Sequence, residues 1–161
     1  IGAFSLSQDL NITRKEAEKY IAGYFAKYPN IKAYMDKTVQ YAEKNGYVET
    51  LFHRRRAMPE LQAKTFAQRS FGERVAMNMP IQGTAADIIK IAMIQVHKKL
   101  QQASLRARLI LQVHDELLLE VHKDDAKQAA FLLKETMENA VSLDVPMVVE
   151  VHQGNSWFET K

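Results

Sequence analysis

The sequence predicts an α+β protein, with helices in its first half and a small antiparallel sheet packed on helices in its second half. Two observations carry this prediction. Apolar residues recur at helical spacing over much of residues 13–100. Further along, two alternating apolar runs surround the polar cluster His114-Asp115-Glu116. A length of 161 residues suits one domain or two small subdomains.

Two helices are expected before residue 46. Thr13 and Glu16 form the capping-box pattern of a helix start, and apolar residues follow at helical spacing until Pro29. A second helix, roughly residues 31–45, ends where Gly46 stands in the position of a C-terminal cap.

Residues 47–100 should hold a short hairpin and two helices. The hairpin lies in YVETLFHRRRAMPEL and ends at Pro59. A helix from about Phe66 to Asn78 is expected to stop near Pro80, because proline lacks an N–H and disfavours a helical residue before it. A new helix should start there, and its apolar stripe is Ala85, Ile88, Ile89, Ala92, Met93, Val96 and Leu100.

The apolar runs of RLILQVHDELLLEV predict a β-hairpin. A two-residue turn would bring glutamates onto the apolar face, so we expect a three-residue turn formed by His114, Asp115 and Glu116. The expected register pairs Val113 with Leu117, Leu111 with Leu119 and Leu109 with Val121.

One more helix and one more strand should complete the fold. KDDAKQAAFLLKETMENAV predicts an amphipathic helix with Asp124 as its N-cap. PMVVEVHQG predicts a strand with Met147, Val149 and Val151 facing inward. The expected sheet is therefore the hairpin plus one strand.

Composition restricts the classes of function. Hydrophobic residues make up 47% of the chain, enough for a core, and no segment approaches the roughly 20 apolar residues of a membrane helix. We therefore expect no membrane partner. The absence of cysteine excludes a disulfide framework and fits a reducing compartment, so we expect a cytoplasmic protein. The start IGAFSLSQDL has no initiator Met and suggests a piece of a longer chain.

Positive charge is concentrated in one segment. The net charge is +3, yet residues 53–74 alone contain six basic and two acidic residues, so the rest of the chain is slightly acidic. Such a basic segment indicates a polyanionic partner, although a solvated surface face explains it equally well.

Asp115 and Glu116 are adjacent carboxylates on the expected hairpin tip. They repel one another unless a cation binds between them, and Mg²⁺ typically takes one or two carboxylates and completes its shell with water and phosphate. A metal site is one interpretation, and a purely structural turn aspartate is the other.

Arg74, Asn78 and Gln82 are spaced by four and would share a helix face. Their side chains are donors that reach phosphates and base edges. A hydrated polar face explains the same spacing, and Pro80 weakens the geometry between Asn78 and Gln82.

Four segments together resemble one family. QVHDELLLEV resembles the third sequence motif of family A DNA polymerases, the bacterial DNA polymerase I type, and RVAMNMPIQGTAADIIKIAM resembles the segment just upstream of it. GYVETLFHRRRAMPEL and PNIKAYMDKTVQYAEKNGYVET resemble the family's fingers region. The resemblance covers nearly the whole chain in the right order.

This resemblance implies a right-hand polymerase, with residues 1–80 as the later fingers and residues 81–161 as the C-terminal part of the palm. The parent enzyme would transfer deoxynucleotides to a primer 3′-hydroxyl with two Mg²⁺ ions. Its partners would be template-primer DNA and deoxynucleoside triphosphates, its role DNA replication or repair, and its state a monomer.

The resemblance also assigns roles to residues. Asp115 would ligate the catalytic Mg²⁺ ions, with Glu116 beside it and His114 near the primer terminus. The residues expected to contact template-primer DNA or its backbone are Arg74, Asn78, Gln82, Arg54, Arg55 and Arg56.

The resemblance implies that Asp115 would supply one half of a two-metal site, because the family's second aspartate lies on a strand that residues 1–161 do not match. The chain alone is therefore expected to be inactive. Two alternatives are a non-catalytic nucleic-acid-binding module and, less favoured, a phosphohydrolase built on the His114-Asp115 pair. The phosphohydrolase needs further His and Asp ligands, and His53, His97, His122 and His152 show no ligand spacing.

Overall fold

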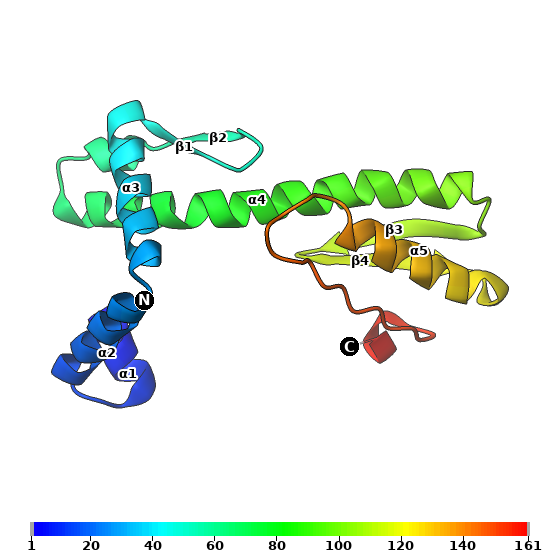
Figure 1. Ribbon diagram of the computed structural model, residues 1–161, viewed down its shortest axis with the longest axis horizontal. Coiled ribbons are helices and arrows are strands. Elements are labelled where there is room, and N and C mark those ends of the chain that lie inside the picture. Colours follow the sequence, from blue (N-terminus) through cyan, green and yellow to red (C-terminus); the bar gives the residue numbers. More distant parts are fainter. Residues whose placement is uncertain (1, 161) are drawn as a thin grey trace. The chain divides into compact units, whose positions relative to one another are not determined.

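The computed structural model describes residues 2–160 (Figure 1), which fall into two compact units. Unit 1 holds the chain up to Glu49 together with Arg55–Pro80, and unit 2 holds Thr50–Arg54 together with the chain from Ile81 onward. Each unit has an apolar core of its own.

Unit 1 is mostly helical, as the sequence predicts, and its hairpin is present where it was expected. Its elements are α1 (Ala3–Leu10), α2 (Arg14–Lys27), α3 (Pro29–Asn45), β1 (Tyr47–Glu49), β2 (Arg55–Ala57), the 3₁₀ helix η1 (Pro59–Gln62) and the first part of α4 (Phe66–Gln102). Helix α1 was not predicted. It spans eight residues and its N-cap, Gly2, offers no side chain to mark the start.

Local chemistry explains where α2 and α3 begin and end. Glu16 N donates to the Thr13 hydroxyl, while Thr13 N donates to the Glu16 carboxylate at 2.9 Å, which confirms the capping box. Pro29 occupies the first turn of α3, where its missing N–H costs nothing. Gly46 ends α3 with a φ of 77°, a left-handed conformation that glycine adopts without strain.

The core of unit 1 joins α3, the hairpin and α4. It consists of the buried residues Ala42, Val48, Met58, Leu61 and Ala76. β1 and β2 are antiparallel, with Val48 opposite Arg56. Val48 is buried in this core, whereas Arg56 is exposed.

The expected break at Pro80 is wrong, because α4 continues from Phe66 to Gln102 with Pro80 inside it. An internal proline costs a helix about 3 kcal/mol or more, through a lost hydrogen bond and a clash one turn back. Packing offsets this cost. Ala76 is buried in the core of unit 1, and the predicted stripe that follows is buried in unit 2 at Ile89, Ala92, Val96 and Leu100.

Unit 2 places a two-stranded sheet against helices, as Figure 1 shows. After α4 it contains β3 (Ala107–Val113), β4 (Glu116–Val121), the 3₁₀ helix η2 (Lys123–Asp125), α5 (Ala126–Glu138) and the 3₁₀ helix η3 (Trp157–Thr160). Leu117 and Leu119 of β4 pack against Val96 and Leu100 of α4 and Leu133 of α5.

The register of the β3–β4 hairpin differs from the one we predicted. The turn has two residues, Val113 pairs with Glu116, and the register shifts between Leu109 and Leu111. This irregularity reconciles the short turn with an apolar inner face, because it brings Leu109 opposite Leu119. Parity alone cannot reveal an extra residue inside a strand.

The predicted last strand is also wrong. Residues 146–153 form no strand with any other part of the described chain. The predicted alternation nevertheless holds, because Met147, Val149 and Val151 are partly buried while their neighbours are exposed. The backbone N–H of Val149 donates to the Glu138 carboxylate at 3.0 Å instead of to a neighbouring strand.

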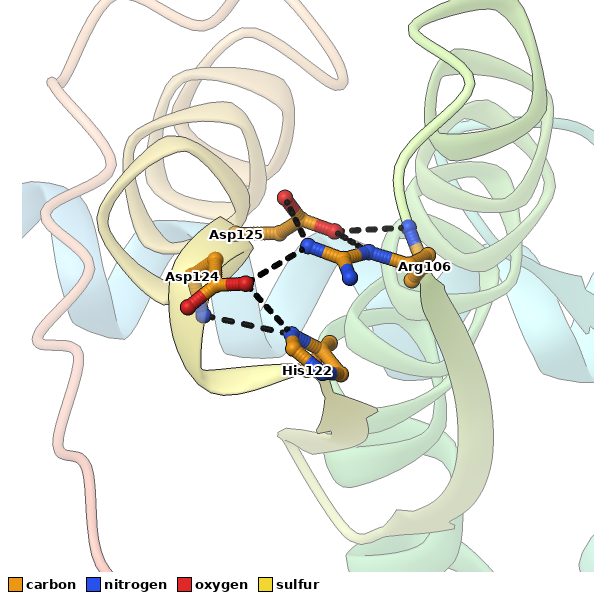
Figure 2. Close-up of polar contacts among 4 residues, drawn as sticks. All are labelled: Arg106, His122, Asp124 and Asp125. Atoms are coloured by element: carbon orange, nitrogen blue, oxygen red, sulfur yellow. Dashed lines mark hydrogen bonds and ion pairs between the residues drawn. The ribbon is translucent and has the colours of Figure 1, made fainter.

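Asp124 does not cap the last helix as predicted. Asp125 occupies the N-cap position of α5, and neither side chain bonds to the helix backbone. Both carboxylates bind Arg106, which precedes β3: Nη2 of Arg106 lies 3.1 Å from Asp124 Oδ2 and Nε lies 2.9 Å from Asp125 Oδ2 (Figure 2). His122 Nδ1 accepts a hydrogen bond from the Asp124 backbone in the same cluster. A tertiary ion pair therefore replaces the expected local cap.

From Gly2 to Thr160, the structure contains no helix that combines the length and the apolar character needed to cross a bilayer.

Candidate functional site

The tip of the β3–β4 hairpin is a tight and braced turn. His114 has a φ of 51°, the positive value that the first turn position requires in the two-residue turns that suit the twist of β-hairpins. The side chain of Gln112 donates to the His114 carbonyl at 2.6 Å and closes the turn from the side. The turn therefore presents Asp115 from a fixed backbone.

Asp115 and Glu116 project from this turn into solvent. Within residues 2–160, neither carboxylate has a hydrogen bond or an ion pair. Two adjacent carboxylates without a counter-ion repel each other, and this repulsion falls when a cation binds them. The arrangement is therefore suited to a bound cation.

A groove of about 480 Å³ in unit 2 begins at these carboxylates. One wall comes from the hairpin, another from residues 148–152, and Leu133 and Met137 of α5 also line it. Glu150 and His152 contribute polar atoms, and His152 Nε2 lies 3.8 Å from Glu150 Oε2. Gln112 and Glu150 were not singled out from the sequence, and His152 was set aside as a metal ligand. The alternation of residues 147–151 places Glu150 and His152 on the exposed side of this segment, and this was the signal that could have identified them.

The donor set at the tip fits part of a divalent metal site. Carboxylate oxygens are the ligands that Mg²⁺ prefers, and it usually takes one or two of them. However, the described chain brings together no group of three His, Cys, Asp or Glu side chains able to hold a metal ion. Asp115 and Glu116 can thus hold a metal ion only in combination with ligands from elsewhere.

The sequence predicts a polar face on α4 made of Arg74, Asn78 and Gln82, and all three side chains are exposed. Arg74 and Asn78 lie one helical turn apart in unit 1, and Gln82 lies in unit 2. Nη1 of Arg74 donates to the Ser70 hydroxyl at 3.1 Å, which leaves most of its N–H groups available. These residues can donate hydrogen bonds to a ligand.

Each arginine of the 54–56 cluster has a carboxylate partner. Nε of Arg54 lies 2.7 Å from Asp87 Oδ1, and Nη2 of Arg56 lies 4.0 Å from Glu60 Oε1. Arg55 binds Glu49 at 3.1 Å, and its guanidinium lies 4.4 Å from the centre of the Tyr47 ring. The positive charge that the sequence concentrates in this segment is therefore partly balanced within the fold.

Comparison with known proteins gives consistent results. The profile of DNA polymerase family A matches residues 1–159. DNA polymerase I of Geobacillus stearothermophilus is 52% identical over 161 residues, which are 100% of this chain and 18% of that protein. DNA polymerase I of Bacillus subtilis (strain 168) is also 52% identical, with the same shares covered.

A solved structure has the same fold. It is the POL domain of Pol1 from M. smegmatis in complex with DNA primer-template and dNTP, with a TM-score of 0.94 and 43% identity over 99% of this chain and 28% of that chain. The chain therefore belongs to DNA polymerase family A. It spans 18% of the length of the two curated relatives named above.

Proposed function

We propose that this chain is the later-fingers and C-terminal palm portion of a template-directed DNA polymerase that acts in DNA replication and repair. Unit 1 would belong to the fingers and unit 2 to the palm. Family membership over residues 1–159 supports this proposal, as does the likeness to a polymerase domain bound to primer-template and dNTP. The parent enzyme would be a cytoplasmic monomer whose partners are template-primer DNA and deoxynucleoside triphosphates.

The exposed Asp115 carboxylate on a braced turn is the observation that carries the proposed activity. Asp115 would hold divalent metal ions, most simply Mg²⁺, with Glu116 beside it and a second aspartate supplied by the rest of the polymerase. Bound there, the ions would lower the pKa of the primer hydroxyl and stabilise the charge of an in-line displacement at phosphorus.

The chain's other residues would position the DNA. His114 would lie near the primer terminus because it shares the turn with Asp115. Arg74, Asn78 and Gln82 would donate to template-primer DNA, partly in the minor groove. Acceptors there are common to all correct base pairs, so such donors sense the shape of a pair without reading its sequence.

The basic cluster would lie near the DNA backbone. Arg55 and Arg56 are exposed and use few of their N–H groups inside the protein, so they can also contact phosphates. Arg54 is engaged by Asp87 and by a backbone carbonyl, which leaves it the least available of the three.

Primer extension by the full-length polymerase tests the assignment. Asp115→Asn removes a metal ligand but keeps the size of the side chain, so it should abolish nearly all extension with Mg²⁺ while DNA binding stays largely intact. Glu120→Gln is the matched control, because Glu120 lies on the same hairpin and pairs with Arg108. It should leave extension unchanged. Near-normal turnover of Asp115→Asn would contradict the proposed role of the tip.

The 161 residues alone should not extend a primer. Two-metal catalysis needs ions about 4 Å apart, each with its own ligands, and the described residues offer too few acids in one place. Template-directed extension by the isolated chain with Mg²⁺ and all four deoxynucleoside triphosphates would show that a complete site exists within it.

A further inference from the structure

The tip of the first hairpin, Thr50–Arg54, is bound to the part of α4 that follows Pro80, inside unit 2. Arg54 donates through Nε to Asp87 Oδ1 at 2.7 Å and through Nη2 to the Gly83 carbonyl at 2.9 Å. The backbone N–H of Leu51 donates to the Thr84 hydroxyl at 2.9 Å. Segments 29 to 33 residues apart in sequence are thus joined by three hydrogen bonds.

The tip is itself closed by internal hydrogen bonds. The Thr50 hydroxyl accepts from the backbone N–H groups of Phe52 and Arg54, both at 3.2 Å. The backbone N–H of Thr50 donates to the Arg54 carbonyl at 3.0 Å. Arg54 therefore extends from a loop that is held by its own hydrogen bonds, and its side chain binds α4 directly.

Asp87 is the less exposed partner in this contact. Its side chain is 13% exposed, and its Oδ2 is buried without a hydrogen-bond partner among the described residues. Burial raises the pKa of the Asp87 carboxyl, but hydrogen bonds from Thr50 and Arg54 outweigh it and hold the pKa below its ordinary value. Asp87 is therefore ionised at neutral pH, with Arg54 as its hydrogen-bonded counter-charge and Lys90 as a second nearby positive charge.

Gln82 lies directly beside this contact. Its neighbour Gly83 accepts the Arg54 hydrogen bond, and Thr84 accepts the one from Leu51, so the turn that carries Gln82 is held from outside the helix. The Gln82 side chain itself is exposed and free to meet a ligand.

We propose that Asp87 and Arg54 are positioning residues that fix the first turn of α4 after Pro80 and so hold Gln82 in place for primer-template DNA. This inference rests on the proposed function, in which Gln82 contacts DNA. Arg54 then acts through Gln82 and not through a phosphate.

The direction in which Asp87→Asn changes DNA affinity distinguishes a positioning role of Arg54 from a phosphate-binding role. Asp87→Asn removes the counter-charge of Arg54. If Arg54 bound a phosphate, freeing it would leave DNA binding unchanged or tighter. If Arg54 is a positioning residue, the same substitution loosens the turn of Gln82 and weakens binding, by about tenfold if one hydrogen bond from Gln82 to DNA is lost.

A double-mutant cycle in the full-length polymerase tests the coupling. The variants are Asp87→Asn, Gln82→Ala and their combination, and the measurements are the Kd for primer-template and the KM and kcat of extension. We expect each single variant to raise the Kd for primer-template. If Asp87 acts through Gln82, the Kd of the double variant should equal that of Gln82→Ala within about twofold, whereas the fold-changes of two independent sites would multiply. Asp125→Asn is the matched control, because Arg106–Asp125 is also an arginine–aspartate pair, with side chains 56% and 20% exposed against 48% and 13% for Arg54–Asp87. Its effect should multiply with that of Gln82→Ala.

Arg54→Lys provides a second route if Asp87→Asn fails to fold. Lysine keeps the charge but cannot make both hydrogen bonds in the geometry of the guanidinium, so it should weaken binding with an unchanged salt slope. The inference would be overturned if the fold-changes in Kd caused by Asp87→Asn and Gln82→Ala multiplied in the double variant. It would also be overturned if either Gln82→Ala or Arg54→Lys bound DNA normally. An unsubstituted polymerase that binds no DNA and extends no primer would instead contradict the proposed function.

Discussion

The guanidinium of Arg106 binds the carboxylate of Asp125 at 2.9 Å through Nε, and the backbone N–H of Arg106 donates to the same oxygen at 3.1 Å. The residue before β3 is thereby fixed to the residue before α5 (Figure 2). This anchor lies at the base of the hairpin whose tip carries Asp115. The strand that leads to the proposed metal site thus starts from a fixed point.

The stabilisation that Asp125→Asn removes should depend on pH in one direction. The hydrogen bonds from Arg106 lower the pKa of the Asp125 carboxyl in the folded protein. A lowered pKa means that the stabilisation is fully present above the unfolded pKa, about 3.9, and is lost as pH falls through the folded value. Urea unfolding at pH 7 should show the variant to be less stable, and the difference should shrink below about pH 4. A difference that grows as the pH falls would contradict this.

Two glycine-to-alanine substitutions should have opposite effects. Gly46→Ala forces a Cβ into a left-handed conformation, φ 77°, and should destabilise unit 1 by about 1–2 kcal/mol. Gly23→Ala lies inside α2, where an added Cβ meets no atom within 4 Å, and should stabilise by about 0.5–1 kcal/mol. Thermal unfolding of both variants measures the contrast, and equal signs would count against the cap at Gly46.

Thr13→Ala removes the capping box of α2. The Thr13 hydroxyl accepts from Glu16 N, so removal of the hydroxyl should destabilise the helix by about 1 kcal/mol. Thr38→Ala is the control, because the Thr38 hydroxyl bonds the Tyr34 carbonyl inside α3 and alanine is the better helix former there. Hydrogen exchange of the α2 amides should quicken in the first variant alone.

Local signals explain why much of the fold could be predicted. Thr13 with Glu16 and the glycine at 46 mark helix ends through side-chain and backbone chemistry within four residues. The stripe that ends at Leu100 and the alternation around Val149 follow from burial of one face. Each of these features depends on neighbours along the chain.

The features that were mispredicted depend on tertiary contacts. Packing on both sides of Pro80 keeps α4 continuous, and an irregularity near Ile110 sets the hairpin register. Arg106 binds Asp124, the residue that was predicted to cap the last helix. The spacing of residues along the chain does not reveal such distant partners.

The candidate site shows the same division. Asp115 could be singled out because a charged cluster interrupts two apolar runs, a local contrast. Asp87 could not, since its partner Arg54 is 33 residues earlier and its burial exists only in the fold. The arginine cluster was identified from its charge, but the carboxylates that balance it emerge only in three dimensions.

The salt dependence of DNA binding should distinguish Arg55 and Arg56 from Arg54. Replacement of Arg55 and Arg56 by alanine should lower the slope of log K against log salt by about 0.9 for each duplex phosphate that is no longer neutralised. Hydrogen bonding to Glu49 raises the pKa of Arg55, so its charge is present at every working pH. Because the effect concerns phosphates, it should be the same for all DNA sequences.

Arg54→Ala and Arg14→Ala complete this comparison. Arg54→Ala should weaken binding without a change of slope, because we assign it a positioning role. Arg14 pairs with Glu18 on the exposed surface of α2, and its replacement should change neither affinity nor slope. If the slope falls equally for Arg54→Ala, Arg54 contacts phosphate after all. If it stays constant when Arg55 and Arg56 are both replaced, these side chains belong to a solvated surface and the phosphate contacts must come from other residues.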